Sequence, residues 1–240
     1  ANVINMSLAG IVSNCTTGDP ALNSILSRAA NDDILVVAAT GNSGSSANYY
    51  PACSPHVMGV GSVDSSGSRS SYSNYGSQNV DIVAYVGDGS PSTSYSWQRV
   101  YYCGISCSSS ITNFTSFANW SGSGTSFASP QVVGLAAIIY SIDPTLTKAE
   151  VVSYLENNAD DTVGPSIGSD TETGAGAIDF EASFNAAASD NTTPSIAIVE
   201  PNGSGDNADE TFLVTWTDSD IDNDAEVNLY WDNDTNFAIG

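Results

Sequence analysis

Two short segments of the sequence carry residues that could perform acyl-transfer chemistry. In SGSGTSFASP, Ser126 follows a Gly-Thr pair and begins an apolar, helix-like run, where free N–H groups and the helix dipole stabilise negative charge. In AATGNSG, Asn42 lies just beyond an apolar run typical of a buried parallel strand. Hydrolysis of an acyl group needs a nucleophile together with donors for the oxyanion, here an asparagine amide and a backbone N–H. The two segments therefore predict a hydrolase site containing Ser126 and Asn42.

Each of these two residues also has a simpler interpretation. Ser126 alone could be a helix cap, and Asn42 alone could be a turn residue. The pairing favours catalysis, because one residue is expected at the carboxyl end of a strand and the other at the start of a helix.

A serine nucleophile also needs a base to accept its proton, and the chain contains one histidine. That residue, His56, lies in PACSPHVMGV and leads into an expected strand. We interpret it as a surface or loop histidine, so the base is expected to lie outside this sequence.

The elements that would position the two segments alternate along the first two-thirds of the chain. The expected strands are Val3–Leu8, Ile34–Thr40, Val57–Val63 and Val80–Ala84. Asp19 and Pro20 open a helix, and the residues expected on its apolar face are Leu22, Ile25, Leu26 and Ala29. Strands and helices that alternate with right-handed crossovers give an α/β fold, in which helices flank a parallel sheet.

The later part of this region predicts further helices. The run Ser126–Ser141 is apolar nearly all round and predicts a buried central helix, in which Gly134, Ala136 and Ala137 permit close packing. Thr147 and Glu150 have the spacing of a capping box and open an amphipathic helix that ends near Asn157. The segment 174–187 is expected to form a turn, a short strand and a closing helix. Ser, Tyr and Gly dominate the segment 85–121, which predicts a long exposed loop.

The charge balance excludes some partners. The chain has 27 acidic residues and four basic residues, for a net charge of −23. Such a surface repels nucleic acid and anionic lipid, and no apolar run reaches the length of a membrane span. A strongly acidic surface stays hydrated in salty water, as expected of a secreted protein from a saline source.

Four cysteines permit two disulfides in three connectivities. We favour the pairs Cys15–Cys53 and Cys103–Cys107, formed in an oxidising compartment. Four reduced thiols in a cytosolic protein are the alternative.

The composition changes at the segment 189–195. Three stretches beyond it alternate or are rich in β-branched and aromatic residues, so 189–240 is expected to be the start of a truncated β-sandwich module that follows a catalytic region, 1–188. One acidic run in this module has a carboxylate at every second position, at Asp218, Asp220, Asp222 and Asp224. These residues could converge on calcium, but a solvated acidic loop is favoured.

The segment GTSFASPQVVGLAA resembles the nucleophile motif of the subtilisin-like serine peptidases. Further segments resemble that family in the family's own order, across about residues 1–188: VINMSL, VVAATGNSG, YYPA, VMGVGSVD, SYSNYGS and VDIVA. The resemblance implies that Ser126 is the nucleophile and that Asn42 provides an oxyanion-hole donor. It also implies substrate-binding residues, which are Ser7, Leu8 and Ala9 as a strand that pairs with the substrate backbone, and Ala38, Ala39, Thr40 and Gly41 around the pocket for the residue before the cleaved bond.

Two features depart from the family's pattern. The family carries its aspartate in an Asp-Thr/Ser-Gly segment and its histidine in a His-Gly-Thr segment, both upstream of the serine, and neither occurs here. The sequence is therefore expected to be a piece of a longer secreted endopeptidase, and the piece alone is expected to be inactive. Gln131 stands where many relatives have a histidine, which is not the catalytic one.

The resemblance implies protein or peptide substrates and no cofactor for the chemistry, with structural calcium as a possibility. The oligomeric state is left open. The alternative function is a catalytically inactive relative that binds peptides or acts in adhesion.

Overall fold

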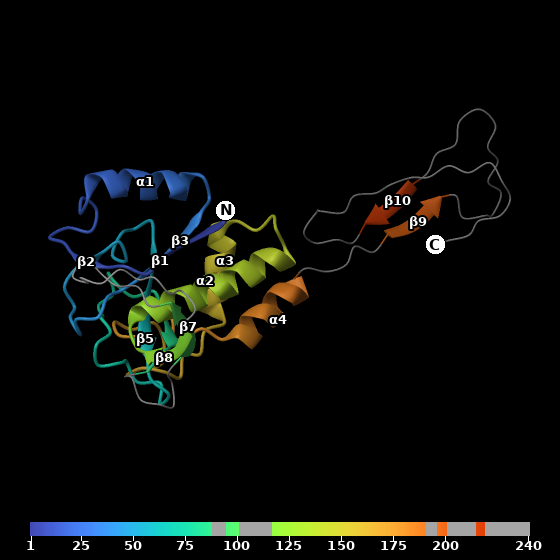
Figure 1. The fold of residues 1–240 in the computed structure, drawn as a ribbon. Coiled ribbons are helices and arrows are strands. Elements are labelled where there is room, and N and C mark those ends of the chain that lie inside the picture. Colours follow the sequence, from blue (N-terminus) through green and yellow to red (C-terminus); the bar gives the residue numbers. More distant parts are fainter. Residues whose placement is uncertain (88–94, 101–116, 191–195, 201–214, 219–240) are drawn as a thin grey trace. The chain divides into compact units, whose positions relative to one another are not determined.

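The computed structural model describes residues 1–87, 95–100, 117–190, 196–200 and 215–218 (Figure 1). The chain forms two compact units, Ala1–Ala187 and Ala188–Gly240. All residues of the two chemically interesting segments belong to the first unit.

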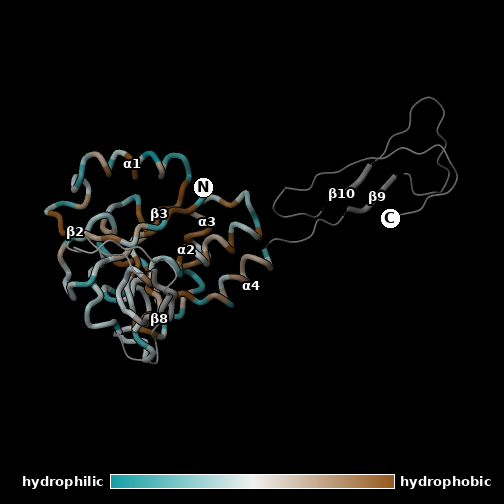
Figure 2. Tube along the Cα trace, in the orientation of Figure 1, coloured by the Kyte–Doolittle hydropathy of each residue, from teal (hydrophilic) through white to brown (hydrophobic). Residues whose placement is uncertain are grey.

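The first unit is built on a parallel four-stranded sheet, as the sequence predicts. Its strands are β1 (Val3–Met6), β3 (Leu35–Ala39), β5 (Met58–Val63) and β6 (Ile82–Tyr85), in the spatial order β1-β3-β5-β6. Every residue of β3 and β5 is buried, as expected for strands covered on both faces. In Figure 2, β3 has the brown colour of hydrophobic residues.

Helix α1 (Pro20–Asn31) begins at the predicted cap. The carboxylate of Asp19 accepts hydrogen bonds from the N–H groups of Ala21 and Leu22, each at 3.0 Å. The prediction that Ile25 lies on the buried face is wrong, because its side chain is 63% exposed. Leu22, Leu26 and Ala29 are spaced i, i+4, i+7 and form the face against the sheet, from which Ile25 is rotated by about 100°.

Helix α2 (Thr125–Ile142) crosses the sheet and contacts all four of its strands, as well as α3 (Lys148–Asn157). Val132, Leu135 and Ile139 are fully buried in the main core. The opposite face carries Gly134 and Ile138, both exposed, so the prediction of nearly all-round burial is wrong on that side. By length and composition alone this helix could cross a membrane, but its buried face is the core of the sheet layer.

The first unit also contains two further helices and a short pair of strands. The predicted capping box of α3 is present, and α4 (Phe180–Asp190) is the expected closing helix. In place of the short strand expected in 174–187, the structure has isolated bridges, in which Ala177 pairs with Val83 and Asp160 and Gly174 pairs with Asp170. The strands β2 (Gly10–Ile11) and β4 (Tyr49–Tyr50) form a small antiparallel pair that the sequence does not predict. Cys15 and Cys53 are joined in a disulfide beside this pair, as favoured from the sequence.

The segment 85–121 is not wholly a loop. It contains β7 (Tyr95–Val100), which pairs antiparallel with β8 (Phe117–Gly122) in a register that sets Trp97 opposite Trp120. Aromatic and β-branched residues favour strands, and this tendency outweighs the Ser-rich composition on which the loop prediction rests. Cys103 and Cys107 lie outside the described residues.

In the second unit, β9 (Ile196–Glu200) and β10 (Thr215–Asp218) pair antiparallel. The third expected strand lies outside the described residues, and so do Asp220, Asp222 and Asp224 of the acidic run. The β-sandwich stays a prediction.

Candidate active site

Ser126 occupies the predicted place at the start of α2. The helix begins at Thr125 after Gly124, whose φ of 135° is a conformation that favours glycine. A Cβ on Gly124 would lie 3.2 Å from Nδ2 of Asn42. A larger residue at this position would therefore push the asparagine away, and the Gly-Thr-Ser order permits the close approach.

Asn42 lies beside the same turn, although 83 residues separate it from Thr125. Its Oδ1 accepts hydrogen bonds from the N–H of Thr125 at 2.8 Å and from the Thr125 hydroxyl at 2.9 Å. Oγ1 of Thr125 in turn accepts from the N–H of Gly41 at 3.0 Å. Because the oxygen and nitrogen of an amide point in different directions, these bonds fix the direction in which Nδ2 donates.

The end of β1 completes the surroundings of Ser126. The Ser126 hydroxyl donates to the carbonyl oxygen of Ser7 at 3.3 Å, and the Ser7 hydroxyl donates to the carbonyl oxygen of Ser126 at 2.9 Å. Asn5 donates to the Ser7 hydroxyl at 3.0 Å and accepts from the Ser129 hydroxyl at 2.5 Å. This chain of bonds connects the strand end to the first turn of α2 on both sides of the candidate nucleophile.

His56 lies at the amino ends of the parallel strands, and Asn42 lies at their carboxyl ends. His56 precedes β5, whereas Asn42 follows the carboxyl end of the parallel neighbour β3. It lines a cavity of about 360 Å³ together with Lys148 and Glu156. The structure therefore does not bring His56 to Ser126, in agreement with its interpretation as a loop residue.

The proposed substrate residues lie on two neighbouring segments. Ser7, Leu8 and Ala9 are exposed, while Ala38, Ala39 and Thr40 are at most 1% exposed. Gly41, the next residue, is partly exposed, and a Cβ on it would lie 3.1 Å from Cβ of Ala9. Ala9 and Gly41 thus adjoin one another next to Asn42. The substrate roles of these seven residues stay predictions.

One residue near Asn42 has no counterpart among the sequence predictions. Asn74 is fully buried and bonds to the loop that carries Asn42. It lies in SYSNYGS, which entered the sequence analysis only as part of the resemblance. Its polar type at a buried position was the available signal, but burial could not be read from the Ser-rich segment around it.

A second cavity, of about 450 Å³, is acidic and shares Asp81 and Glu156 with the cavity beside His56. Asp81, at the amino end of β6, lines this second cavity with Glu156, Asp161 and Asp170. Burial raises the pKa of Asp81, against the lowering effect of the Gly59 N–H that donates to it at 2.6 Å. Burial and then the charge of Asp81 raise the pKa of Glu156. In the part of the chain that the structure describes, no three His, Cys, Asp or Glu residues group as metal ligands, and structural calcium stays a prediction.

Two glutamates of α3 should respond oppositely to pH. A raised folded-state pKa means that Glu156 destabilises the fold above that pKa, and the cost disappears as pH falls toward the unfolded value of about 4.3. Hydrogen bonds from Thr147 lower the pKa of Glu150, so its stabilisation is present at neutral pH and is lost on acidification. We expect Glu156→Gln to raise the thermal midpoint at pH 7 and Glu150→Gln to lower it. Both differences should shrink by pH 4 in calorimetry, and equal signs for the two variants would contradict this assignment.

Comparisons with known proteins point to one family. The model of the Subtilase family, Peptidase_S8, matches residues 1–176. Subtilisin NAT from Bacillus subtilis subsp. natto is 38% identical over 162 residues, which are 66% of this chain and 35% of that protein. Subtilisin BL from Lederbergia lenta is 33% identical over 175 residues, 71% of this chain and 55% of that protein. A solved structure of a protease from Pseudoalteromonas arctica PAMC 21717 matches with a TM-score of 0.62 and 29% identity, covering 78% of this chain and 51% of the other.

These matches define the class of the protein as a subtilisin-like α/β fold. The chain belongs to the subtilase family. It spans only 35% to 55% of the length of the two subtilisins, so the activity of a whole enzyme does not follow from membership alone.

Proposed function

We propose that this chain supplies the nucleophile and the oxyanion-hole asparagine of a secreted serine endopeptidase that hydrolyses peptide bonds in proteins. The observation that supports it most is the contact between two distant segments, in which the side chain of Asn42 is bonded to the residue before Ser126. A cap or a turn residue needs no such partner across 83 positions of sequence.

In this proposal Oγ of Ser126 attacks the carbonyl carbon of the scissile bond. Nδ2 of Asn42 and the backbone N–H of Ser126, which lies in the first turn where helical N–H groups have no intrahelical acceptor, donate to the resulting oxyanion. A base takes the proton of the Ser126 hydroxyl and passes it to the leaving amine as the tetrahedral intermediate collapses, which leaves an acyl group on Ser126. Water then attacks the acyl carbon, releases the carboxylic acid and restores the Ser126 hydroxyl. Ser7–Ala9 would hold the substrate as an added strand.

In this proposal the base that accepts the Ser126 proton comes from polypeptide outside this sequence. The one histidine of the sequence, His56, lies at the opposite ends of the parallel strands. Two partly exposed apolar surfaces, one on β1 and one on α2, support a place for that polypeptide. Among the described strands β1 pairs with β3 alone, and its Ile4 is 39% exposed. On α2, Ile138 is 40% exposed and a Cβ on Gly134 would meet no atom within 4 Å. Covering these surfaces would bury apolar area and could bring a histidine toward Ser126.

Secretion is part of the proposal. The disulfide Cys15–Cys53 needs an oxidising compartment, and a net charge of −23 suits a protein that works in saline surroundings.

A fluorophosphonate probe tests the proposed function. The full-length protein is expected to take up one phosphonyl group, which peptide mapping should place on Ser126. The 240-residue chain produced alone should remain unlabelled, because it lacks the base. Retained peptide binding without labelling of the full-length protein would instead indicate the inactive peptide-binding relative.

A further inference from the structure

We propose that Asn74 is a positioning residue for the oxyanion hole, which holds the loop 40–45 so that Asn42 stays beside Ser126. This inference rests on the proposed function. Asn74 makes no contact with the reacting atoms in this proposal and acts through Asn42.

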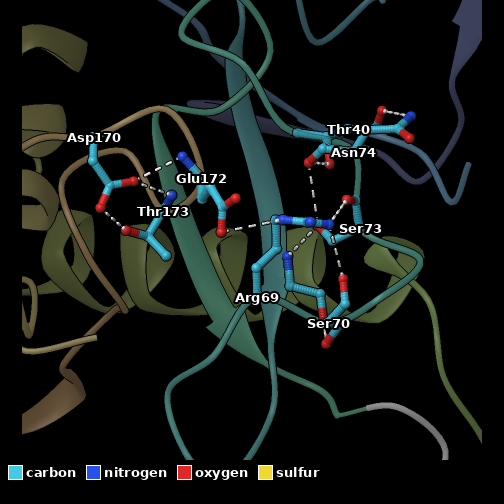
Figure 3. Close-up of polar contacts among 9 residues, drawn as sticks. Thr40, Arg69, Ser70, Ser73, Asn74, Asp170, Glu172 and Thr173 are labelled. Carbon is cyan, nitrogen blue, oxygen red and sulfur yellow. Dashed lines mark hydrogen bonds and ion pairs between the residues drawn. The ribbon is translucent and has the colours of Figure 1, made fainter. Parts of the chain in front are cut away.

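The side chain of Asn74 forms hydrogen bonds with the loop on both sides of Asn42. Its Nδ2 donates to the carbonyl oxygen of Thr40 at 2.7 Å, and its Oδ1 accepts from the N–H groups of Ser43 at 2.9 Å and Ser45 at 3.1 Å. Figure 3 shows the side chain of Asn74 against Thr40. Residues 40 and 43 flank Asn42 closely, so one side chain fixes the entry and the exit of the turn that presents the amide.

The main chain of Asn74 also forms hydrogen bonds with this loop. Its N–H donates to the carbonyl oxygen of Gly41 at 3.0 Å, and its own carbonyl oxygen accepts from the Thr40 hydroxyl at 3.4 Å. Gly41 has a φ of 98°, and a Cβ there would lie 2.5 Å from Nδ2 of Asn74. The loop therefore passes so close to Asn74 that only glycine fits at position 41.

The segment that carries Asn74 is itself anchored. Nη1 of Arg69 donates to the carbonyl oxygens of Ser73 at 2.8 Å and Ser70 at 3.3 Å, and its Nε lies 3.4 Å from the carboxylate of Glu172 (Figure 3). The guanidinium also lies over the ring of Tyr75, 4.6 Å from its centroid. Arg69 thus contacts both neighbours of Asn74, the carbonyl oxygen of Ser73 and the ring of Tyr75, and fixes the position from which Asn74 holds the loop.

A fixed loop matters because an oxyanion donor works only over a short distance. Nδ2 of Asn42 must come within about 2.7–3.1 Å of the developing oxyanion. A displacement of about 1 Å can cost a factor of about 10² in rate. Release of the loop should therefore lower the turnover number, because the donor of Asn42 is displaced. Asn74 also bonds to Thr40 and Gly41, which are predicted to surround the substrate pocket, so its loss should raise KM as well.

A double-mutant cycle in the full-length protein tests this role. Turnover of a peptide p-nitroanilide would be measured for Asn74→Ala, Asn42→Ala and the double variant, with each kcat expressed per site titrated by fluorophosphonate. We expect Asn74→Ala to lower kcat about 10- to 100-fold. KM should rise too, because Thr40 and Gly41 lose a hydrogen-bond partner, so the readout for the positioning of Asn42 is kcat. In the Asn42→Ala background the same substitution should lower kcat less than about threefold, because the donor that Asn74 positions is already absent.

Asn79 provides a matched control. It is also fully buried and also makes three side-chain bonds, accepting from the N–H of Tyr49 and donating to the carbonyl oxygens of Ala47 and Tyr75. Asn79→Ala should destabilise the protein comparably, yet it should change kcat by the same factor in both backgrounds. Asn74→Asp keeps the side-chain volume and the two acceptor contacts, so it serves if the alanine variant does not fold and should show the same dependence on Asn42.

The outcomes separate this inference from the function on which it rests. Absence of labelling at Ser126 in the wild type would overturn the proposed function. Normal labelling with an Asn74 effect that is equal with and without Asn42, or with no Asn74 effect at all, would overturn the positioning role and leave the proposed function intact.

Discussion

Replacement of Ser126 by alanine in the full-length protein is expected to reduce kcat for peptide hydrolysis about a millionfold. That magnitude is the one measured in subtilisin itself when its serine is removed, and it is adopted here because this chain belongs to the same family. The physical reason is that no acyl-enzyme can form once Oγ is absent, while the donors to the oxyanion remain. Steady-state kinetics on a peptide amide would measure the loss, and KM should change little.

Ser123→Ala is the matched control for this prediction. Ser123 is an exposed serine three residues earlier, just before α2, and its hydroxyl has no part in the proposed chemistry. Its replacement should leave the rate within about twofold, as is usual for surface changes of less than about 0.5 kcal/mol. A Ser126→Ala protein that retained more than a few percent of the wild-type rate would contradict the assignment of the nucleophile.

Replacement of Asn42 by alanine is expected to lower kcat by about 10²–10³, with a smaller change in KM. This factor is again the one known for the oxyanion-hole asparagine of subtilisin. The donor acts on charge that exists only in the transition state, so its loss should affect turnover more than binding of the substrate. The bonds from Thr125 to Oδ1 make the effect specific, because they aim the remaining donor, Nδ2.

The comparison for Asn42 is Asn48→Ala, which changes an asparagine of the same connection between β3 and β4. Its backbone carbonyl accepts from Val12, a bond that the substitution keeps. We expect its kcat to stay near the wild-type value. If Asn42→Ala instead raised KM with kcat unchanged, Asn42 would be a substrate-binding residue and not an oxyanion donor.

The sequence is sufficient to predict the parallel sheet and the contact between the two candidate segments around Asn42 and Ser126. Apolar runs without alternation at β3 and β5 indicate strands that are buried on both faces. The parallel topology then places Asn42 at the carboxyl ends of the strands, where α2 begins. The caps at Asp19 and Thr147 could be read as well, because capping depends on residues only a few positions apart.

The features that could not be predicted from the sequence depend on contacts with residues far away in the chain. The apolar spacing of α1 predicts a buried Ile25, but the residue is exposed. Spacing alone does not decide which side of a wide apolar stripe is buried, because that depends on what the helix packs against. The exposed side of α2, with Ile138, looks buried in sequence because its composition is that of a helix covered on all sides. Asn74 shows the same limit within the site, since its three side-chain bonds reach residues about 30 positions away.

The most direct test of the account is a crystal structure of the full-length protein after reaction with a fluorophosphonate. The central claim is that Asn42 and the first turn of α2 converge on one oxyanion position beside the hydroxyl of Ser126. We predict phosphorus bonded to Oγ of Ser126, with one phosphonyl oxygen within about 3 Å of both Nδ2 of Asn42 and the backbone nitrogen of Ser126. An adduct on another residue, or a phosphonyl oxygen directed away from Asn42 into solvent, would contradict the claim.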